Sequence, residues 1–279
     1  MKIIYADVPR ALTGALVRGV RYEFTDHRIL LSVDGIARYL IEDGRQIAIA
    51  RDRIADDRDI RVFLLSSVFG ALFHQRHDLV LQGSAINCDG DAIVFIGSSG
   101  IGKSTLAAAF REEGHAVLAD DFCVVRPGAD GRMYAFPAFP EVKLWPDSLE
   151  HLGIAANELP RVRDRLEKRI VSMGDNFDGS ALPVRGLYEL CDDDIPEPKV
   201  IRVDGVQKLI VLTNNIHRVG FLATDEAKAN STRLAMKLAQ QATVSIVLRS
   251  RNAFRLAALV ASIESDLQKQ KTRSHHLVR

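Results

Sequence analysis

The stretch GSSGIGKST, at positions 97–105, decides the fold of this chain. It matches the pattern GxxxxGK[ST] through Gly97, Gly102, Lys103 and Ser104. Glycines at such positions let the backbone curl so that successive N–H groups point inward, where they can hydrogen-bond phosphate oxygens. The stretch therefore predicts a phosphate-binding loop.

The residues on both sides of this loop supply the context that the pattern requires. Positions 92–96 form an apolar run typical of a buried strand, and positions 104–113 predict a helix that Gly114 closes. A strand, a glycine loop and a helix in this order indicate an α/β fold. The alternative is a glycine-rich turn that only joins a strand to a helix.

Each part of the loop has a distinct expected task. The helix that begins near Lys103 adds the positive end of its dipole, and Lys103 offers a point charge to the β and γ phosphates of ATP. Ser104 can coordinate Mg²⁺, so ATP and Mg²⁺ are the expected cofactors. The loop residues expected to bind the nucleotide are Gly97, Ser98, Ser99, Gly100, Ile101, Gly102, Lys103, Ser104 and Thr105.

Two adjacent carboxylates, Asp120 and Asp121, follow a predicted strand at positions 116–119, one helix after the loop. If the ends of the two strands lie side by side in the sheet, the acids face the phosphates. Adjacent residues on an extended strand point to opposite faces, so the two acids need different roles. One could hold Mg²⁺ through its water shell, and the other could accept a proton from an attacking hydroxyl. The alternative is an acidic pair that caps a turn.

Positions 81–121, LQGSAINCDGDAIVFIGSSGIGKSTLAAAFREEGHAVLADD, resemble the core of the HPr kinase/phosphorylase family. The shared features are a strand pair, the glycine loop, a helix ending in Gly-His, and Ala-Asp-Asp. The resemblance implies a phosphoenolpyruvate-carboxykinase-like P-loop fold with a mixed sheet. The likeness is greatest to HPr-kinase-like proteins found with lasso-peptide biosynthesis, because FPEVKLWPDSLEHLG (139–153) and LEKRIV (166–171) also have counterparts there.

The resemblance also implies roles for individual residues. Asp121 is then the general base, and Asp120 supports Mg²⁺ and its waters. Lys103, from the loop pattern, is the third residue expected to take part in catalysis. The bifunctional family has Leu-His-Gly where this sequence has glutamine at the middle position, Gln82. Glutamine cannot exchange a proton as an imidazole can, which argues against the reverse phosphorolysis reaction.

The segment RVRDRLEKR, at positions 161–169, concentrates positive charge in an otherwise balanced chain. Lys168 and Arg169, in the family-like LEKR, are expected to bind nucleotide phosphates or an acidic peptide. The alternative is a solvated helix face. Trp145, in contrast, is expected in the core.

These observations predict a kinase that transfers the γ-phosphoryl group of ATP to a hydroxyl, a serine of a peptide or small protein. The resemblance favours a lasso-peptide precursor as the acceptor. Two alternatives stay open: an HPr-directed serine kinase/phosphorylase, and a non-catalytic nucleotide-binding regulatory module.

Three parts are expected along the chain. Residues 1–76 predict a small β-rich α+β domain, residues 77–268 the catalytic domain with C-terminal helices, and residues 269–279 a basic tail. In the first part, a helix is expected at 59–75 with Asp59 as its N-cap. The strands expected outside the loop region are at 2–6, 28–33, 46–50, 187–190, 200–203 and 209–212, and the further helices at 225–241 and 253–268.

Composition limits the classes of partner. The chain has 279 residues, 47% of them hydrophobic and 26% charged, and a formal net charge of +1. A global field that would gather nucleic acid or an anionic membrane is therefore not expected. The three cysteines show no CxxC pairing, and no apolar run is long enough to span a membrane. A cytoplasmic protein is expected, and a homo-oligomer is compatible with the sequence.

Overall fold

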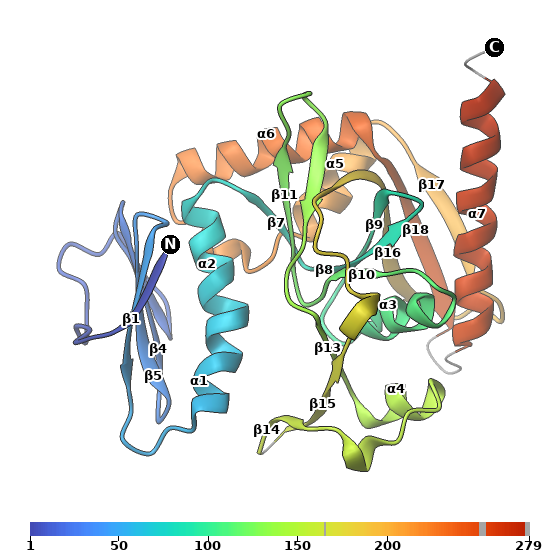
Figure 1. The fold of residues 1–279 in the computed structure, drawn as a ribbon. Coiled ribbons are helices and arrows are strands. Elements are labelled where there is room, and N and C mark those ends of the chain that lie inside the picture. The colour runs from blue at the N-terminus through green and yellow to red at the C-terminus, as the bar shows by residue number, and fades with distance from the viewer. Residues whose placement is uncertain (165, 251–254, 277–279) are drawn as a thin grey trace.

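The computed structural model describes residues 1–164, 166–250 and 255–276 of the chain. Its first six strands form one sheet in which β1 is parallel to β6 and the other neighbouring pairs are antiparallel (Figure 1). In spatial order they are β1 (Lys2–Tyr5), β6 (Gln46–Arg51), β5 (Ala37–Glu42), β4 (Arg28–Val33), β3 (Tyr22–Phe24) and β2 (Val17–Arg18). The strands expected at 2–6, 28–33 and 46–50 are confirmed as β1, β4 and β6.

A helical segment connects this sheet to the larger unit. It consists of α1 (Asp57–Phe63), the π-helical turn η1 (Leu64–Val68) and α2 (Phe69–Gln75). The helix expected at 59–75 is confirmed, but its expected N-cap is wrong. Asp56 is the N-cap, because its carboxylate accepts the Arg58 N–H at 2.7 Å, whereas Asp59 already lies in the first turn.

The larger unit is built on a nine-stranded mixed sheet, as expected. Its main path runs β10 (Val117–Ala119), β8 (Gly83–Cys88), β9 (Asp91–Ile96), β16 (Leu182–Asp193), β12 (Met133–Phe136), β11 (Cys123–Pro127) and β7 (Leu79–Leu81). The strand β18 (Thr243–Ser250) also pairs with β16, and β17 (Lys199–Val203) pairs with β18. The pairs β9–β16 and β16–β18 are parallel, and the other pairs are antiparallel.

Helices cover both faces of this sheet (Figure 1). On β9, Ile93 and Phe95 pack with α3 (Lys103–Glu112) and α7 (Leu256–His276), while Val94 and Ile96 pack with α5 (Val206–Asn214) and α6 (Asp225–Gln241). A strand buried on both faces reads as a continuous apolar run, which explains the sequence before the glycine loop. Among the residues that the structure describes, no helix has the length and apolar character to cross a membrane.

A third, three-stranded sheet stands at the edge of the larger unit. It contains β13 (Glu141–Leu144), β15 (Leu166–Ser172) and β14 (Arg161–Arg163), and α4 (Pro146–His151) follows β13. Its buried Val142 and Val171 pack against Ala108 of α3 and Val117 of β10. Short 3₁₀ turns lie at η2 (Ala156–Glu158), η3 (Gly174–Asn176) and η4 (Val219–Phe221). The described residues of the basic segment 161–169 therefore belong to β14, a turn at Asp164 and the start of β15, and the interpretation of this segment as a helix face is wrong.

Two expectations near the C-terminus need correction. The apolar run at 209–212 lies in α5, because periodicity alone cannot separate a short buried strand from a turn of buried helix. The helix expected at 253–268 is α7, which continues to His276 instead of giving way to a tail at 269. Gln270, beyond the expected end, is 9% exposed and donates a hydrogen bond to Tyr188 Oη at 3.2 Å, which ties this part of α7 to β16. Positions 253, 254 and 277–279 lie outside the described residues.

The core of the N-terminal sheet continues into the larger unit. One cluster of buried side chains contains Tyr39 and Ile41 of the first sheet, Leu72 of α2, and Phe122 and Val124 of the larger unit. The boundary expected after residue 76 falls between α2 and β7, beside this shared core.

His217 lies buried in the same junction. The centroid of its ring is 5.4 Å from that of Phe122, and a Cβ at Gly70 of α2 would meet its Cδ2 at 2.9 Å. Its backbone oxygen accepts a hydrogen bond from His74 Nε2 at 2.7 Å. Burial, together with the charge of Arg218, lowers the pKa of His217 to about 3, and burial also lowers the pKa of His74. Both imidazoles are therefore neutral at pH 7 in the folded protein.

These pKa values predict acid sensitivity. Between about pH 6.5 and pH 3 the unfolded chain protonates His217 and the folded protein does not, so the free energy of unfolding should fall as the pH falls, by about 1.4 kcal/mol per pH unit. His217→Gln should flatten this part of the pH dependence, as measured by denaturant unfolding between pH 7 and pH 4. The control is His27→Gln, because the side chain of His27 is 81% exposed. Parallel pH profiles for wild type and His217→Gln would contradict the assignment.

Candidate functional site

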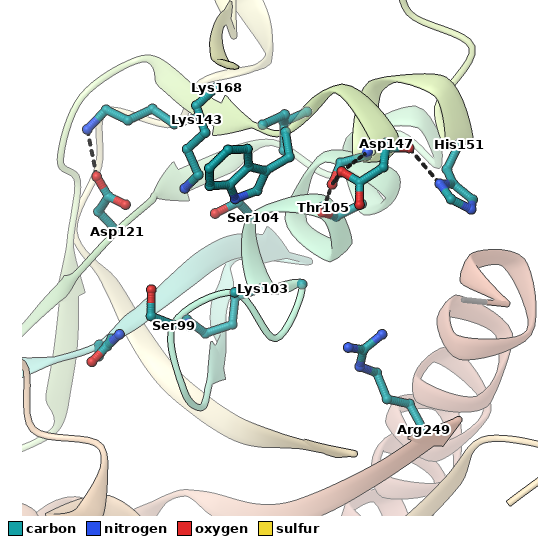
Figure 2. A pocket seen from close by; sticks show the side chains of 16 residues that line it. Ser99, Lys103, Ser104, Thr105, Asp121, Lys143, Asp147, His151, Lys168 and Arg249 are labelled. Carbon is teal, nitrogen blue, oxygen red and sulfur yellow. Dashed lines mark hydrogen bonds and ion pairs between the residues drawn. The ribbon is translucent and has the colours of Figure 1, made fainter. Parts of the chain in front are cut away.

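A cavity of about 290 Å³ opens where the glycine loop meets the third sheet, α4 and the end of β18 (Figure 2). The loop contributes Ser99, Gly100, Gly102, Lys103, Ser104 and Thr105 to its wall. The rest of the wall is Gln82, Asp121, Lys143, Leu144, Trp145, Asp147, Ser148, His151, Lys168 and Arg249. Among these described residues, four cationic side chains face two carboxylates, so the cavity has an excess of positive charge.

The backbone of the loop has the conformation that its glycines make available. Gly97 has φ 140°, and a Cβ there would lie 2.9 Å from the Leu190 carbonyl oxygen. Gly102 has φ 99° and is the N-cap of α3, which places the N-terminus of that helix at the cavity. A strand, a tight glycine loop and a helix N-terminus thus follow one another as the sequence predicts.

Three loop residues that were expected to bind nucleotide do not line the cavity: Gly97, Ser98 and Ile101. The side chain of Ile101 is buried in the core beside α3 and α7, and its N–H donates to Ser98 O at 3.3 Å. Thr105 does line the cavity, and its hydroxyl hydrogen-bonds Ser148 Oγ at 2.8 Å, which ties α3 to α4.

Lys103 is folded back onto its own loop. Its ammonium donates to Gly97 O at 2.9 Å and to Ser98 O at 2.7 Å, and the residue is only 8% exposed. Burial lowers the pKa of Lys103 to about 8, although Asp120 and Asp121 oppose this effect. A buried cation beside a glycine loop and a helix N-terminus is suited to an anionic ligand.

The two acids follow the C-terminal end of β10, at the same end of the sheet as the loop after β9, but β10 and β9 are not neighbouring strands. β10 and β9 are both antiparallel to β8, which lies between them, so the two strands run in the same direction one strand apart. The expectation that their ends lie side by side is wrong, because β8 occupies the middle position.

Asp120 and Asp121 have different surroundings. Asp120 is 8% exposed, does not line the cavity, and accepts hydrogen bonds from Ser84 Oγ at 2.7 Å and from the backbone N–H of Lys143 at 3.1 Å. Asp121, with φ 69°, turns its carboxylate to the cavity wall, where Lys143 Nζ donates to Oδ2 at 2.6 Å. Burial alone would raise the pKa of Asp121, but the Lys143 ammonium outweighs this effect and holds the pKa below its usual range.

Lys168 and Arg169, which were expected to act as a pair, lie on opposite faces of β15. Lys168 lines the cavity, with its ammonium 5.6 Å from the centroid of the Trp145 ring. Arg169 does not, and its guanidinium lies 3.6 Å from Glu167 Oε2. Neighbouring side chains on β15 alternate between faces, so the two residues do not both reach the cavity.

Sequence reasoning missed several residues of the wall, above all Lys143, Trp145 and Arg249. Trp145 is 41% exposed, so the expectation that it lies in the core is wrong. Lys143 and Trp145 are separated by one residue in FPEVKLWPDSLEHLG, and that spacing on a strand edge was the available signal. Arg249, which pairs with Asp192 at 2.9 Å, had no local signal, because β18 reaches the site only through its pairing with β16.

Comparisons with known proteins add a fold likeness. No family model and no curated protein matches the sequence. Among solved structures, the chain is similar to the structure of the HPr(Ser) kinase/phosphatase from Coxiella burnetii, with 12% sequence identity and a TM-score of 0.41. The similarity covers 71% of this chain and 97% of that chain.

The lysine of the loop gives the first test of the site. Trp145 is the single tryptophan of the chain and lines the cavity, so its fluorescence should respond when Mg²⁺ and ATP are added. Lys103→Met should weaken the binding by about 10- to 100-fold, since hydrogen bonds to charged groups contribute about 1.5–3 kcal/mol. Lys199→Met, on the exposed end of β17, is the matched control. Identical titrations for wild type and Lys103→Met would exclude this cavity as the nucleotide site.

Proposed function

We propose that this chain is an ATP- and Mg²⁺-dependent kinase that transfers the γ-phosphoryl group to a hydroxyl, a serine of a peptide or small protein. The observation that carries the proposal is the meeting of Lys103, Ser104 and Asp121 on one cavity wall. The first two residues are suited to bind phosphate and metal, and the third to accept a proton.

The wall fits a triphosphate by charge and by geometry. Lys103, Lys143 and Lys168 bring ammonium groups to one cavity, and the helix N-terminus at Gly102 adds backbone donors. Phosphoryl transfer depends mainly on positioning and on neutralising charge, which is what such a set of cations supplies.

The oxygen ligands fit Mg²⁺ in the way that nucleotide sites use it. Mg²⁺ keeps several waters and is bound through one or two protein oxygens together with the phosphates. Ser104 offers a hydroxyl on the cavity wall. Asp120 precedes Asp121 in the chain, does not line the cavity, and already accepts hydrogen bonds from Ser84 and Lys143. Asp120 would then act through a water of the metal or by positioning Asp121, and Mg²⁺ would supply charge neutralisation.

The role of Asp121 distinguishes a kinase from a protein that only binds nucleotide. Its carboxylate is ionised and faces the cavity, so it can accept a proton from an acceptor hydroxyl. As that proton leaves, the hydroxyl oxygen bonds to the γ-phosphorus, and the bond to the bridging oxygen breaks so that ADP leaves with the electron pair.

For the acceptor we propose a lasso-peptide precursor, on the strength of the sequence resemblance at 139–153 and 166–171. Trp145 and Lys168 at the cavity suit a peptide chain, because an exposed indole and an ammonium can contact apolar and acidic side chains. A cytoplasmic location fits free Cys88, Cys123 and Cys191. No binding to nucleic acid or membrane is proposed, and a homo-oligomer is compatible with the site.

One observation argues against the first of two rival functions, and one observation favours the second. An HPr-directed kinase/phosphorylase shares the loop and the acids, but Gln82 on the cavity wall cannot exchange the proton that the reverse reaction needs. A regulatory module that binds nucleotide without transferring phosphate is favoured by the ion pair between Lys143 and Asp121, which occupies the expected base.

Paired asparagine variants separate the kinase from the regulatory module. Asp121→Asn should retain ATP binding, since the loop and Lys103 remain, while peptide phosphorylation falls by about 10²- to 10⁴-fold with the loss of a general base. Asp120→Asn should show part of its defect as a higher Mg²⁺ requirement. The measurements are ATP affinity, Mg²⁺ dependence and phosphopeptide formation at one pH. Normal phosphorylation by Asp121→Asn would refute its role as the base.

A further inference from the structure

Lys143 contacts both acids of the site. Its backbone N–H donates to Asp120 Oδ2 at 3.1 Å, and its ammonium donates to Asp121 Oδ2 at 2.6 Å. Its side chain is 16% exposed, and that of Asp121 is 31% exposed. The register of β13 with β15, in which Lys143 lies opposite Ile170, fixes the residue in this place.

The other two ammonium groups of the wall are also engaged by the protein itself. Lys103 donates to Gly97 O and Ser98 O, and Lys168 lies over the face of Trp145. Of the three lysines, Lys143 is the one whose ammonium hydrogen-bonds the carboxylate proposed as the base. While this pair is intact, Asp121 Oδ2 is engaged and the ammonium holds the pKa of the carboxyl low, which weakens Asp121 as a proton acceptor.

We propose that Lys143 is a further catalytic residue, whose ammonium leaves Asp121 for the terminal phosphate when ATP binds and so frees Asp121 to act as the base. This inference rests on the kinase function proposed above. The movement of the Lys143 ammonium makes the base available only when a γ-phosphate is present, since ADP has no group at that position.

The exchange is favourable for physical reasons. A terminal phosphate carries more charge than a carboxylate and offers several acceptor oxygens, so a part-buried ammonium within reach of both gains by moving to it. Asp121 then carries a negative charge that is no longer neutralised, which strengthens it as a proton acceptor for the incoming hydroxyl. The backbone N–H of Lys143 stays on Asp120 throughout, because it belongs to β13.

The relative affinity for ATP and ADP tests this exchange, with Trp145 fluorescence as the readout. Wild type should bind Mg²⁺·ATP at least about 10-fold more tightly than Mg²⁺·ADP, since one hydrogen bond between charged groups contributes that much. Lys143→Met should remove this preference by weakening ATP binding while ADP affinity changes by less than about twofold. Lys143→Arg should keep the preference, and Lys199→Met is the control for loss of a lysine elsewhere. A preference that survives Lys143→Met overturns the inference.

A second variant and a direct observation cover the case in which Lys143→Met does not fold. The double variant Asp121→Asn/Lys143→Met has no unpaired carboxylate and should show the same loss of preference for ATP. In a crystal structure of wild type with Mg²⁺ and a non-hydrolysable ATP analogue, Lys143 Nζ should lie within hydrogen-bond distance of the terminal phosphate. An ammonium still on Asp121 would overturn the inference. If wild type binds no ATP, the proposed function itself fails, which is a distinct result.

Discussion

The hydrogen bond from Ser84 Oγ to Asp120 Oδ1, 2.7 Å long, is the contact on which the site depends. Ser84 is fully buried and Asp120 nearly so. A carboxylate in such surroundings is strongly destabilising unless its oxygens accept hydrogen bonds, and the second bond comes from the backbone N–H of Lys143. One side chain thereby holds together the starts or ends of three strands, β8, β10 and β13. The third sheet and the main sheet are joined at this point.

This arrangement explains why so many charges meet in one small cavity. β8 separates β9 from β10, yet both run in the same direction, so the glycine loop and Asp121 emerge at one edge. β13 then brings Lys143 to Asp121, and β15 brings Lys168 to the same wall. Within the protein these charges are satisfied by loop carbonyls, a carboxylate and an indole face. The cost of leaving a buried charge unpaired accounts for each of these contacts.

The N-terminal sheet also bears on the position of Asp121. Phe122 follows directly in the chain and packs in the core shared with Tyr39 and Leu72, beside the buried ring of His217. Because Asp121 has a positive φ, the chain turns sharply between the cavity and this core. Packing of Phe122 between the first sheet, α2 and the larger unit thus fixes the backbone next to the proposed base.

The sequence by itself determined the local elements of the site: the strand, glycine loop and helix at 92–113, the pair Asp120 and Asp121, and the mixed sheet implied by the family resemblance. These elements follow from patterns of a few neighbouring residues, such as apolar runs and glycines, which readily adopt a positive φ. Only the tertiary structure decided that β8 lies between β9 and β10, that Lys168 faces the cavity while Arg169 does not, and that Lys143 and Arg249 complete the wall. Strand order and register arise from pairing between residues far apart in the chain, and a shift of one position moves a side chain to the opposite face, so local patterns do not contain this information.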